Sequence, residues 1–530
     1  MPPPLAYRAA AIAAFMLAGP PALAQQSHDS HTHAPAAKLG TVHFKVDCNA
    51  AAQSEFNLAM AYYHSFAWQH IAEPLDKVAR ADAGCGMVHW ARALATLDNP
   101  FTWPVSISAK VLNEGPGLLE QARTTGLKTQ RERDYVDALA VFFQDPGTRD
   151  HRTRAKAFEG ALGDLAKRYP DDTEAAVLHA LIMSANFDPT DRNYTSQLRA
   201  AQILEPIFKQ QPQHPGVAHY LIHSYDYPPI AKHGIDAARR YAGIAPDATH
   251  ALHMPSHIFT RVGAWKDSIA SNRASAAVAP AHTFDKLHAY DYMVYAHLQL
   301  GQDKAGQQVA EQARAAQLVD NFAYAFAQAA IPARLALERG RWKEAAALEL
   351  WPAADAYPWK KYPHSEAINA FARGIGSAMS GDAAAAEIQA KRLQALSDAM
   401  AALKSPYWVE QIQIQREVVR GLALVSEGKS SEGTVLLGQA ADREDATQKH
   451  VVTPGPLVPA REALAQALLA AGQHKAALQA FQSVLEREPN RYRALAGAAK
   501  AAEGLSDSEQ AARYKRELTA MAEQADTPRD

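Results

Sequence analysis

The chain is built of short stretches in which hydrophobic residues recur at the spacing of an amphipathic helix, and prolines separate some of these stretches at a regular interval. Pro212, Pro246 and Pro280 are each 34 residues apart, and each follows a predicted helix. Because helix interiors disfavour proline, a proline at a constant interval marks where successive helices end. The pattern predicts repeated helical units with a period of 34 residues.

A second region of the chain fits the same template. Segment 458–490 carries matching small, apolar and turn residues at Leu464, Ala465, Leu468, Gly472, Ala477, Phe481 and Pro489. A 34-residue pair of helices that ends in proline is typical of the tetratricopeptide (TPR) repeat. One helix pair cannot bury its apolar face alone, whereas a stack of pairs buries a continuous core and leaves a curved inner groove. We therefore predict an all-α, TPR-type superhelix of antiparallel helix pairs, with functional residues on the first helix of each pair.

Composition shifts divide the chain into five predicted segments. They are a signal peptide (1–24), a flexible N-terminal segment (25–45), a TPR-like superhelix with a His-rich groove (46–350), middle helical repeats (351–450) and C-terminal repeats with a tail (451–530). Stretches rich in proline and aromatic residues at 98–117, 351–365 and 441–459 are the predicted breaks between sub-stacks.

The N-terminus has the pattern of a secretory signal. Arg8 precedes an apolar run over residues 9–18, and Ala22-Leu23-Ala24 supplies small residues for cleavage after Ala24. The alternative is an N-terminal membrane anchor, but the run is too short to cross a bilayer about 30 Å thick. We expect an exported protein, periplasmic or secreted, without a transmembrane segment after cleavage.

Two cysteines, Cys48 and Cys85, flank the first predicted helix pair. In an oxidising compartment a pair of thiols is expected to join, so a disulfide is predicted here, with two separate buried thiols as the alternative. The balance of charge excludes another class of partner. Lys and Arg number 54 against 56 Asp and Glu, which leaves no basic excess for nucleic acid.

Histidines are concentrated in one region, with ten of the 22 lying between His214 and His297. His219 and His253 are 34 residues apart, and so are His223 and His257. Each pair therefore occupies the same two positions of neighbouring repeats. Residues four apart lie on one face of a helix, one turn apart, so four imidazoles are expected to face a shared space in the groove.

Clustered neutral imidazoles predict a transition-metal site, because imidazole is the commonest protein ligand for such ions. The expected metal is Zn, Cu, Fe or Ni, among which the sequence does not choose. The expected further members are His250, His288, Asp226 and Asp291, with the aspartates as ligands or as partners that orient a ring. Since proline is tolerated in the first turn of a helix, Pro255 suggests a helix start near Met254, with His250 in the preceding loop.

A metal-free interpretation of the histidines stays open at this point. Neighbouring repeats share residues through duplication, and histidines also cap helices, pack under aromatic rings or contact acidic groups of a partner. Grooves in helical repeats accept extended or helical peptides. On this interpretation the protein is an interaction scaffold for a peptide or protein partner.

Two segments of the sequence resemble a group of exported bacterial TPR proteins. The segments are His219-Tyr-Leu-Ile-His223 and residues 250–263, HALHMPSHIFTRVG. The group carries H-Y-x-I-H followed by H-x-x-H-M-P-S-H-I-x-x-R-x-G, together with segments similar to Cys48, 85–90 and 132–135. The resemblance covers roughly residues 45–330. It implies a TPR fold but supplies no activity, and His89 replaces a tyrosine that is common in the group.

No established catalytic motif accompanies the histidines. The sequence lacks His-Glu-x-x-His, Gly-x-Ser-x-Gly and a complete phosphate-binding loop. The predicted function is that of an exported TPR binding protein with a transition metal in its concave groove, where a peptide, protein or small ligand also binds. The alternative is a metal-dependent hydrolase or oxidase, in which an open coordination position activates water or dioxygen.

Overall fold

The computed structural model describes residues 37–103 and 107–527, so the predicted signal peptide and residues 25–36 lie outside the described residues. The first helices are α1 (Ala50–His64), α2 (Ala72–Ala81), α3 (Met87–Ala95), α4 (Ala109–Thr125), α5 (Gln130–Phe143), α6 (His151–Arg168), α7 (Thr173–Ala185) and α8 (Thr195–Gln210). Those of the histidine-rich region are α9 (Pro215–Tyr225), α10 (Ile235–Ile244), α11 (Thr249–His253), α12 (Pro255–Arg261), α13 (Trp265–Val278) and α14 (Asp285–Gln299).

The remaining helices are α15 (Asp303–Arg314), α16 (Phe322–Glu338), α17 (Trp342–Ala346), α18 (Pro363–Met379), α19 (Ala383–Ala402), α20 (Pro406–Ser426), α21 (Ser430–Asp445), α22 (Ala460–Ala470), α23 (His474–Arg487), α24 (Tyr492–Gly504) and α25 (Ser508–Met521). Short 3₁₀ turns occur at Trp68–His70, Pro100–Thr102, Ala231–Gly234 and Trp359–Lys361. No strand occurs in 37–103 or 107–527.

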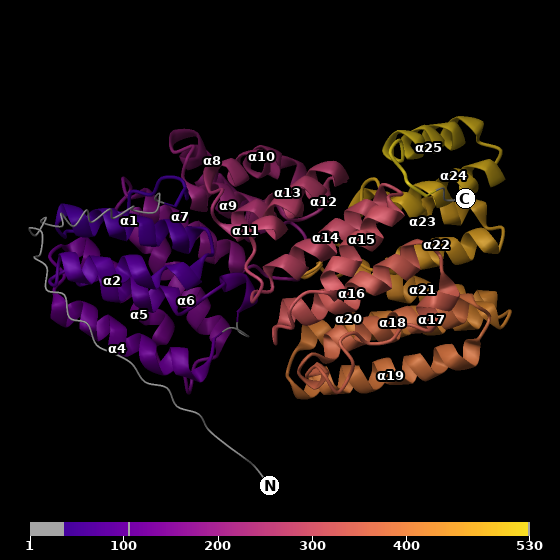
Figure 1. Ribbon diagram of the computed structural model, residues 1–530, viewed down its shortest axis with the longest axis horizontal. Coiled ribbons are helices and arrows are strands. Elements are labelled where there is room, and N and C mark those ends of the chain that lie inside the picture. Colours follow the sequence, from indigo (N-terminus) through magenta and orange to yellow (C-terminus); the bar gives the residue numbers. More distant parts are fainter. Residues whose placement is uncertain (1–36, 104–106, 528–530) are drawn as a thin grey trace, which may run out of the picture. The chain divides into compact units, whose positions relative to one another are not determined.

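Consecutive helices pack against each other, and alternate helices form a second set of contacts. In the later part of the chain α14 packs on α16, α16 on α18, α18 on α20, α20 on α22 and α22 on α24. This is the pattern of antiparallel helix pairs whose first helices stack, as Figure 1 shows for α16, α18 and α20. The prediction of an all-α, TPR-type stack is confirmed.

Local sequence explains how the helices that carry the histidines begin. At α9, Pro215 occupies the first turn, where its missing N–H costs nothing, and the ring of His214 accepts a hydrogen bond from Val217 N. Pro255 likewise begins α12. Met254, with φ −52° and ψ −36°, keeps helical backbone between α11 and α12. The predicted start near Met254 is therefore confirmed, but His250 lies on helix α11 and not in a loop.

The C-terminal repeats return to the histidine-rich region. Trp265 Nε1 donates to the carbonyl of Asn490 at 3.0 Å, across 225 positions of sequence. Beside this contact Gly263 has φ +69°, and a Cβ there would lie 2.4 Å from the carbonyl oxygen of Pro489, so only glycine fits. The predicted break at 441–459 is shorter than expected because α21 continues to Asp445, and the loop that follows crosses over α14.

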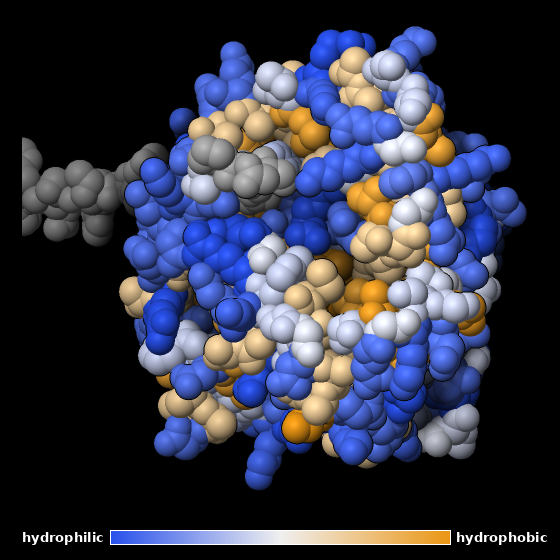
Figure 2. All heavy atoms as spheres, turned by 90° about the vertical axis from the view of Figure 1, so that its right-hand side faces the viewer, coloured by the Kyte–Doolittle hydropathy of each residue, from blue (hydrophilic) through white to orange (hydrophobic). Residues whose placement is uncertain are grey.

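The predicted disulfide is present, joining Cys48 and Cys85 across α1 and α2 with their Cα atoms 5.4 Å apart. On the face shown in Figure 2, hydrophilic residues predominate and hydrophobic residues form only small groups. Within the described residues, we find no helix with the length and apolar character needed to cross a bilayer.

Candidate metal centre

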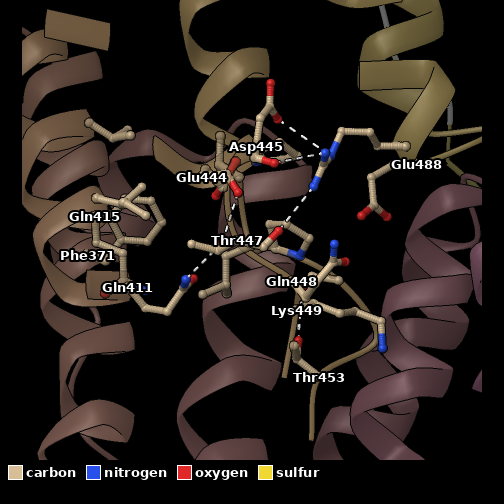
Figure 3. A pocket seen from close by; sticks show the side chains of 18 of the residues that line it. Phe371, Gln411, Gln415, Glu444, Asp445, Thr447, Gln448, Lys449, Thr453 and Glu488 are labelled. Carbon is tan, nitrogen blue, oxygen red and sulfur yellow. Dashed lines mark hydrogen bonds and ion pairs between the residues drawn. The ribbon is translucent and has the colours of Figure 1, made fainter. Parts of the chain in front are cut away.

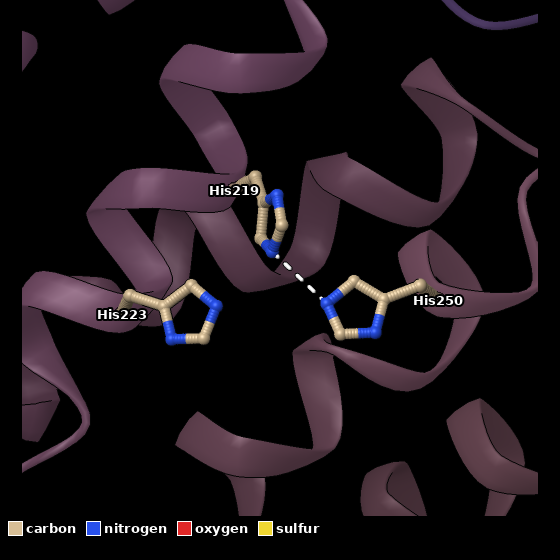
Figure 4. A group of neighbouring side chains, drawn as sticks. All are labelled: His219, His223 and His250. Atoms are coloured by element: carbon tan, nitrogen blue, oxygen red, sulfur yellow. Dashed lines mark hydrogen bonds between the residues drawn. The ribbon is translucent and has the colours of Figure 1, made fainter. Parts of the chain in front are cut away.

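Six histidines come together in the structure as two groups of three. We call His219, His223 and His250 the first imidazole group (Figure 4), and His253, His257 and His288 the second. Within each group, one ring nitrogen from each residue lies within 4.8 Å of the other two. The two groups therefore contain all six histidines that the sequence predicted.

The first group is anchored from behind by the main chain. His219 Nδ1 lies 2.7 Å from the carbonyl oxygen of His64. A carbonyl only accepts, so Nδ1 carries the proton and Nε2 keeps a free lone pair. That Nε2 points at His250 Nε2, 3.1 Å away (Figure 4). His223 Nε2 is buried beside them without a hydrogen-bond partner.

The second group is anchored by side chains. His253 Nδ1 lies 2.6 Å from Asn272 Oδ1, whose own amide donates to Ser268 O at 2.8 Å and so fixes which atom faces the ring. His257 Nδ1 lies 2.9 Å from Asp226 Oδ2. Both Nδ1 atoms are donors in these bonds, so both Nε2 atoms are unprotonated in the neutral rings.

The facing Nε2 atoms of His253 and His257 are the decisive feature of the site. They lie 3.1 Å apart, and with both Nδ1 protons committed there is no hydrogen between them. Protonating one ring would supply a donor, but burial lowers the pKa of both histidines. Two lone pairs held this close in a buried site need a shared cation, and a metal ion satisfies both.

The other four histidines are electrostatically matched to the same role. Burial is the largest cause of a pKa well below 6.5 for His219, His223, His250 and His288. Neighbouring imidazoles lower these pKa values further. The six rings are therefore neutral at pH 7 and ready to coordinate.

Asp226 orients a ring and does not join either group. It accepts from His257, from Arg261 Nε at 2.8 Å and, more distantly, from Lys449 Nζ at 3.5 Å. Burial alone would raise the pKa of Asp226, but Lys449, Arg261 and His257 together hold it well below its usual value. A permanently ionised carboxylate behind His257 makes that imidazole a stronger donor to a metal.

Asp291 lies apart from both groups, which corrects its expected membership in the metal shell. Its carboxylate is fully buried and forms an ion pair with Arg334 Nε at 2.7 Å. Thr453 and Gly455 of the loop after α21 also accept from Arg334. Asp291 therefore fastens that loop over α14 and has no free oxygen directed at the imidazoles.

Aromatic side chains enclose the centre. Phe101 stacks on His223 with ring centroids 3.9 Å apart, and Phe66 lies 4.4 Å from His219. Tyr292 lies beside the second group, 4.9 Å from His253. This enclosure differs from the expected open groove, because the first helices of neighbouring repeats pack closely enough to bury four of the six rings. Only His250 and His288 are partly exposed.

A third cluster, His64, Glu174 and His214, is fully buried and already satisfied. Both histidines donate to Glu174, at 3.0 and 2.9 Å. His64 Nδ1 accepts from the hydroxyl of Tyr220, and His214 Nδ1 accepts from Val217 N. Because every ring nitrogen has a partner, this cluster is a hydrogen-bond network that ties α1, α7 and α9 together.

A cavity of about 110 Å³ adjoins the centre on the side of the loop after α21 (Figure 3). Apolar residues such as Phe371 and Trp408 line it together with Gln411, Gln415 and Glu444. Lys449 also lines the cavity and contacts Asp226, so one residue borders both spaces. Burial raises the pKa of Glu444 to about 7 and lowers that of Lys449 to about 8.

Several supporting residues could not be found from the sequence. Asn272 and the carbonyl of His64 carry no pattern of their own, and Lys449 reaches Asp226 across 223 positions. His64 was expected only as a packing residue. A mid-helix asparagine such as Asn272 was the one available hint, since this residue type is unfavourable there unless its side chain is used.

Comparisons with known proteins give no closer definition. No protein-family model matches the sequence, and no curated protein matches it. The chain is similar to the solved APC/C hetero-tetramer Cut9-Hcn1 at 10% identity, over 90% of this chain and 97% of that chain, with a TM-score of 0.30. It is similar to Naa15/Naa10 bound to HypK-THB at 10% identity, over 90% and 74%, with a TM-score of 0.25.

A third similar structure, the P58(IPK) TPR domain, aligns at 12% identity over 87% of this chain and 99% of that chain, with a TM-score of 0.19. Scores this low support no argument about function. The fold assignment rests on the helix pairs described above, and the resemblance to exported bacterial TPR proteins stays a prediction.

Proposed function

We propose that this protein is an exported, TPR-type metalloprotein that holds transition-metal ions at the two imidazole groups. The observation that carries the proposal is the pair of unprotonated Nε2 atoms of His253 and His257, 3.1 Å apart. Metal–imidazole bonds of about 2.0–2.1 Å place two ligands of one tetrahedral ion about 3.3 Å apart. The rings therefore stand close to the separation that a bound ion requires.

The ligand set favours some ions over others. Each group offers three neutral nitrogens and leaves a coordination position for a further ligand, as in catalytic metal sites. Nitrogen donors suit Zn, Cu, Ni and Fe, whereas Ca and Mg prefer oxygen. The partly exposed rings of His250 and His288 mark the side from which a ligand enters. A hydrolase or oxidase built on this site would use that side for substrate.

Export is supported by two further observations. Residues 1–24 have the pattern of a secretory signal, and Cys48 and Cys85 form a disulfide of the kind that persists in oxidising compartments. An exported metal site has access to ions that the cytoplasm keeps scarce.

Elemental analysis of the full chain, purified without a histidine tag, tests the proposal. We expect up to two equivalents of transition metal per chain, with loss of the second-group ion in a His253→Ala/His257→Ala variant. His282→Ala is the matched control, because His282 lies in the same region but is exposed and outside both groups. Absence of metal from every variant, after reconstitution with Zn, Cu, Ni and Fe in turn, would refute the proposal.

A further inference from the structure

The two imidazole groups are close enough to act as one centre. The ring centroids of His223 and His257, one from each group, are 6.3 Å apart, and those of His250 and His253 are also 6.3 Å apart. Within the first group, His223 and His250 are separated by 6.5 Å. Because rings of different groups are as close as rings of one group, two bound ions are neighbours.

The two groups are also equivalent in construction. Each takes two histidines four residues apart from the first helix of one repeat, on α9 for one group and on α11–α12 for the other. Each takes its third histidine from the next first helix, His250 from α11 and His288 from α14. Equivalent ligands from successive repeats favour two ions of the same element in the same coordination.

Charge then restricts the state of the ions. All six ligands are neutral, and the nearest carboxylate, Asp226, is already paired with Arg261 and Lys449. Two divalent ions here would face an uncompensated repulsion in a buried site. Monovalent ions halve the charge of each, and a bridging anion neutralises it. Copper is the ion in the predicted set that is commonly monovalent and that binds imidazole firmly in both oxidation states.

We infer that the six histidines hold a pair of copper ions and that the reduced pair binds dioxygen between them. Each Cu(I) gives one electron, and the dioxygen molecule takes both to become a bridging peroxide dianion between two Cu(II) ions. No proton enters, and the reverse step returns dioxygen and two Cu(I). The bridging dianion supplies the negative charge that the protein ligands lack. This inference rests on the proposed function, because it requires both groups to bind metal.

The walls of the site suit such a ligand. Phe66 and Phe101 cover the first group, and the ring of Tyr292 lies between His253 and His257 on the second. Its hydroxyl lies near the backbone carbonyls of Val451 and Thr453, at 3.3 and 3.2 Å. Apolar rings limit the water that would protonate a bound peroxide and release it as hydrogen peroxide.

The test loads the metal-free full chain with two equivalents of Cu(I) without oxygen, in the presence of ascorbate, removes the excess reductant, and then admits air. Copper content, paramagnetic resonance and visible absorption are measured before and after. We expect two coppers per chain, a new charge-transfer band, and no paramagnetic resonance because the two Cu(II) ions are coupled. Removal of oxygen under vacuum should reverse the band.

The possible failures are distinguishable. Two coppers per chain that give ordinary isolated Cu(II) resonances, or that give no band in air, overturn the dioxygen inference while leaving the metal site. A single copper per chain overturns the paired centre. No copper, zinc, nickel or iron at all refutes the proposed function itself.

Two variants locate the centre. His250→Ala and His288→Ala each remove one ligand from one group, and each should leave about one copper with a visible single-ion resonance and no charge-transfer band. His282→Ala should behave as the unchanged protein. If a variant fails to fold, X-ray absorption of the unchanged protein decides the matter, because a paired centre shows copper–copper scattering and separate ions do not.

Discussion

The backbone carbonyl of His64 lies 2.7 Å from Nδ1 of His219 and accepts its proton, although the two residues are 155 positions apart in sequence. The ring of His64 is itself fixed by Glu174 and Tyr220. The packing of α1 on α9 therefore sets the tautomer of a predicted metal ligand through a main-chain atom. Substitutions around His64 reach the metal centre only by moving this backbone.

The first prediction separates the third cluster from the metal centre. In Glu174→Gln the amide has one acceptor for two histidine donors, so one N–H is left facing another. We expect a loss of about 2–3 kcal/mol in the free energy of unfolding, measured in urea, with unchanged metal content. Loss of metal from this variant at full folding would show instead that the cluster belongs to the centre.

The second prediction concerns the carboxylate behind His257. Asp226→Asn removes the charge that holds Arg261, Lys449 and the ring, so metal affinity should fall about 10–100-fold and stability by about 3–5 kcal/mol. Competition with a chelator measures the affinity. Asp291→Asn is the matched control: it breaks an equally buried ion pair with Arg334 and should lower stability but leave metal affinity unchanged.

The third prediction is a pH dependence that lies away from the metal ligands. Burial lowers the pKa of His364 from 6.5 to about 3, and neither ring nitrogen has a partner. Below pH 6.5 the unfolded chain takes up a proton that the folded chain refuses, so stability falls as pH falls. Between pH 7 and pH 5 this residue should cost about 2 kcal/mol.

His364→Phe isolates that contribution. The ring lies between Phe322 and Trp408, so phenylalanine keeps an aromatic side chain in the stack. Unfolding curves at pH 7 and pH 5 should show a smaller loss of stability in the variant, by about 2 kcal/mol. An equal loss in both proteins would mean that His364 is protonated in the folded state.

The fourth prediction concerns the disulfide. It closes a loop with a sequence separation of 37, so Cys48→Ser/Cys85→Ser should lower the free energy of unfolding by about 3–4 kcal/mol through the greater entropy of the unfolded chain. Urea unfolding checks this. The unchanged protein should fall to the stability of the variant in dithiothreitol, and the variant itself should not respond to the reductant.

Much of the fold follows from the sequence because its causes are local. Helical spacing of apolar residues, the 34-residue proline interval and Pro255 at the first turn of α12 each act within one repeat. The same periodicity places His219, His223, His253 and His257 on neighbouring first helices. For these residues, the repeat makes sequence distance a substitute for spatial distance.

The tertiary structure alone decided how those residues are used. It divided six histidines into two groups, gave Asp226 to His257 and withdrew Asp291 to Arg334. It also brought Asn272 behind His253, and Lys449 behind Asp226. The sequence could not show these pairings, because a hydrogen bond depends on positions within a few tenths of an ångström. Those positions are set only when helices far apart in the chain pack together.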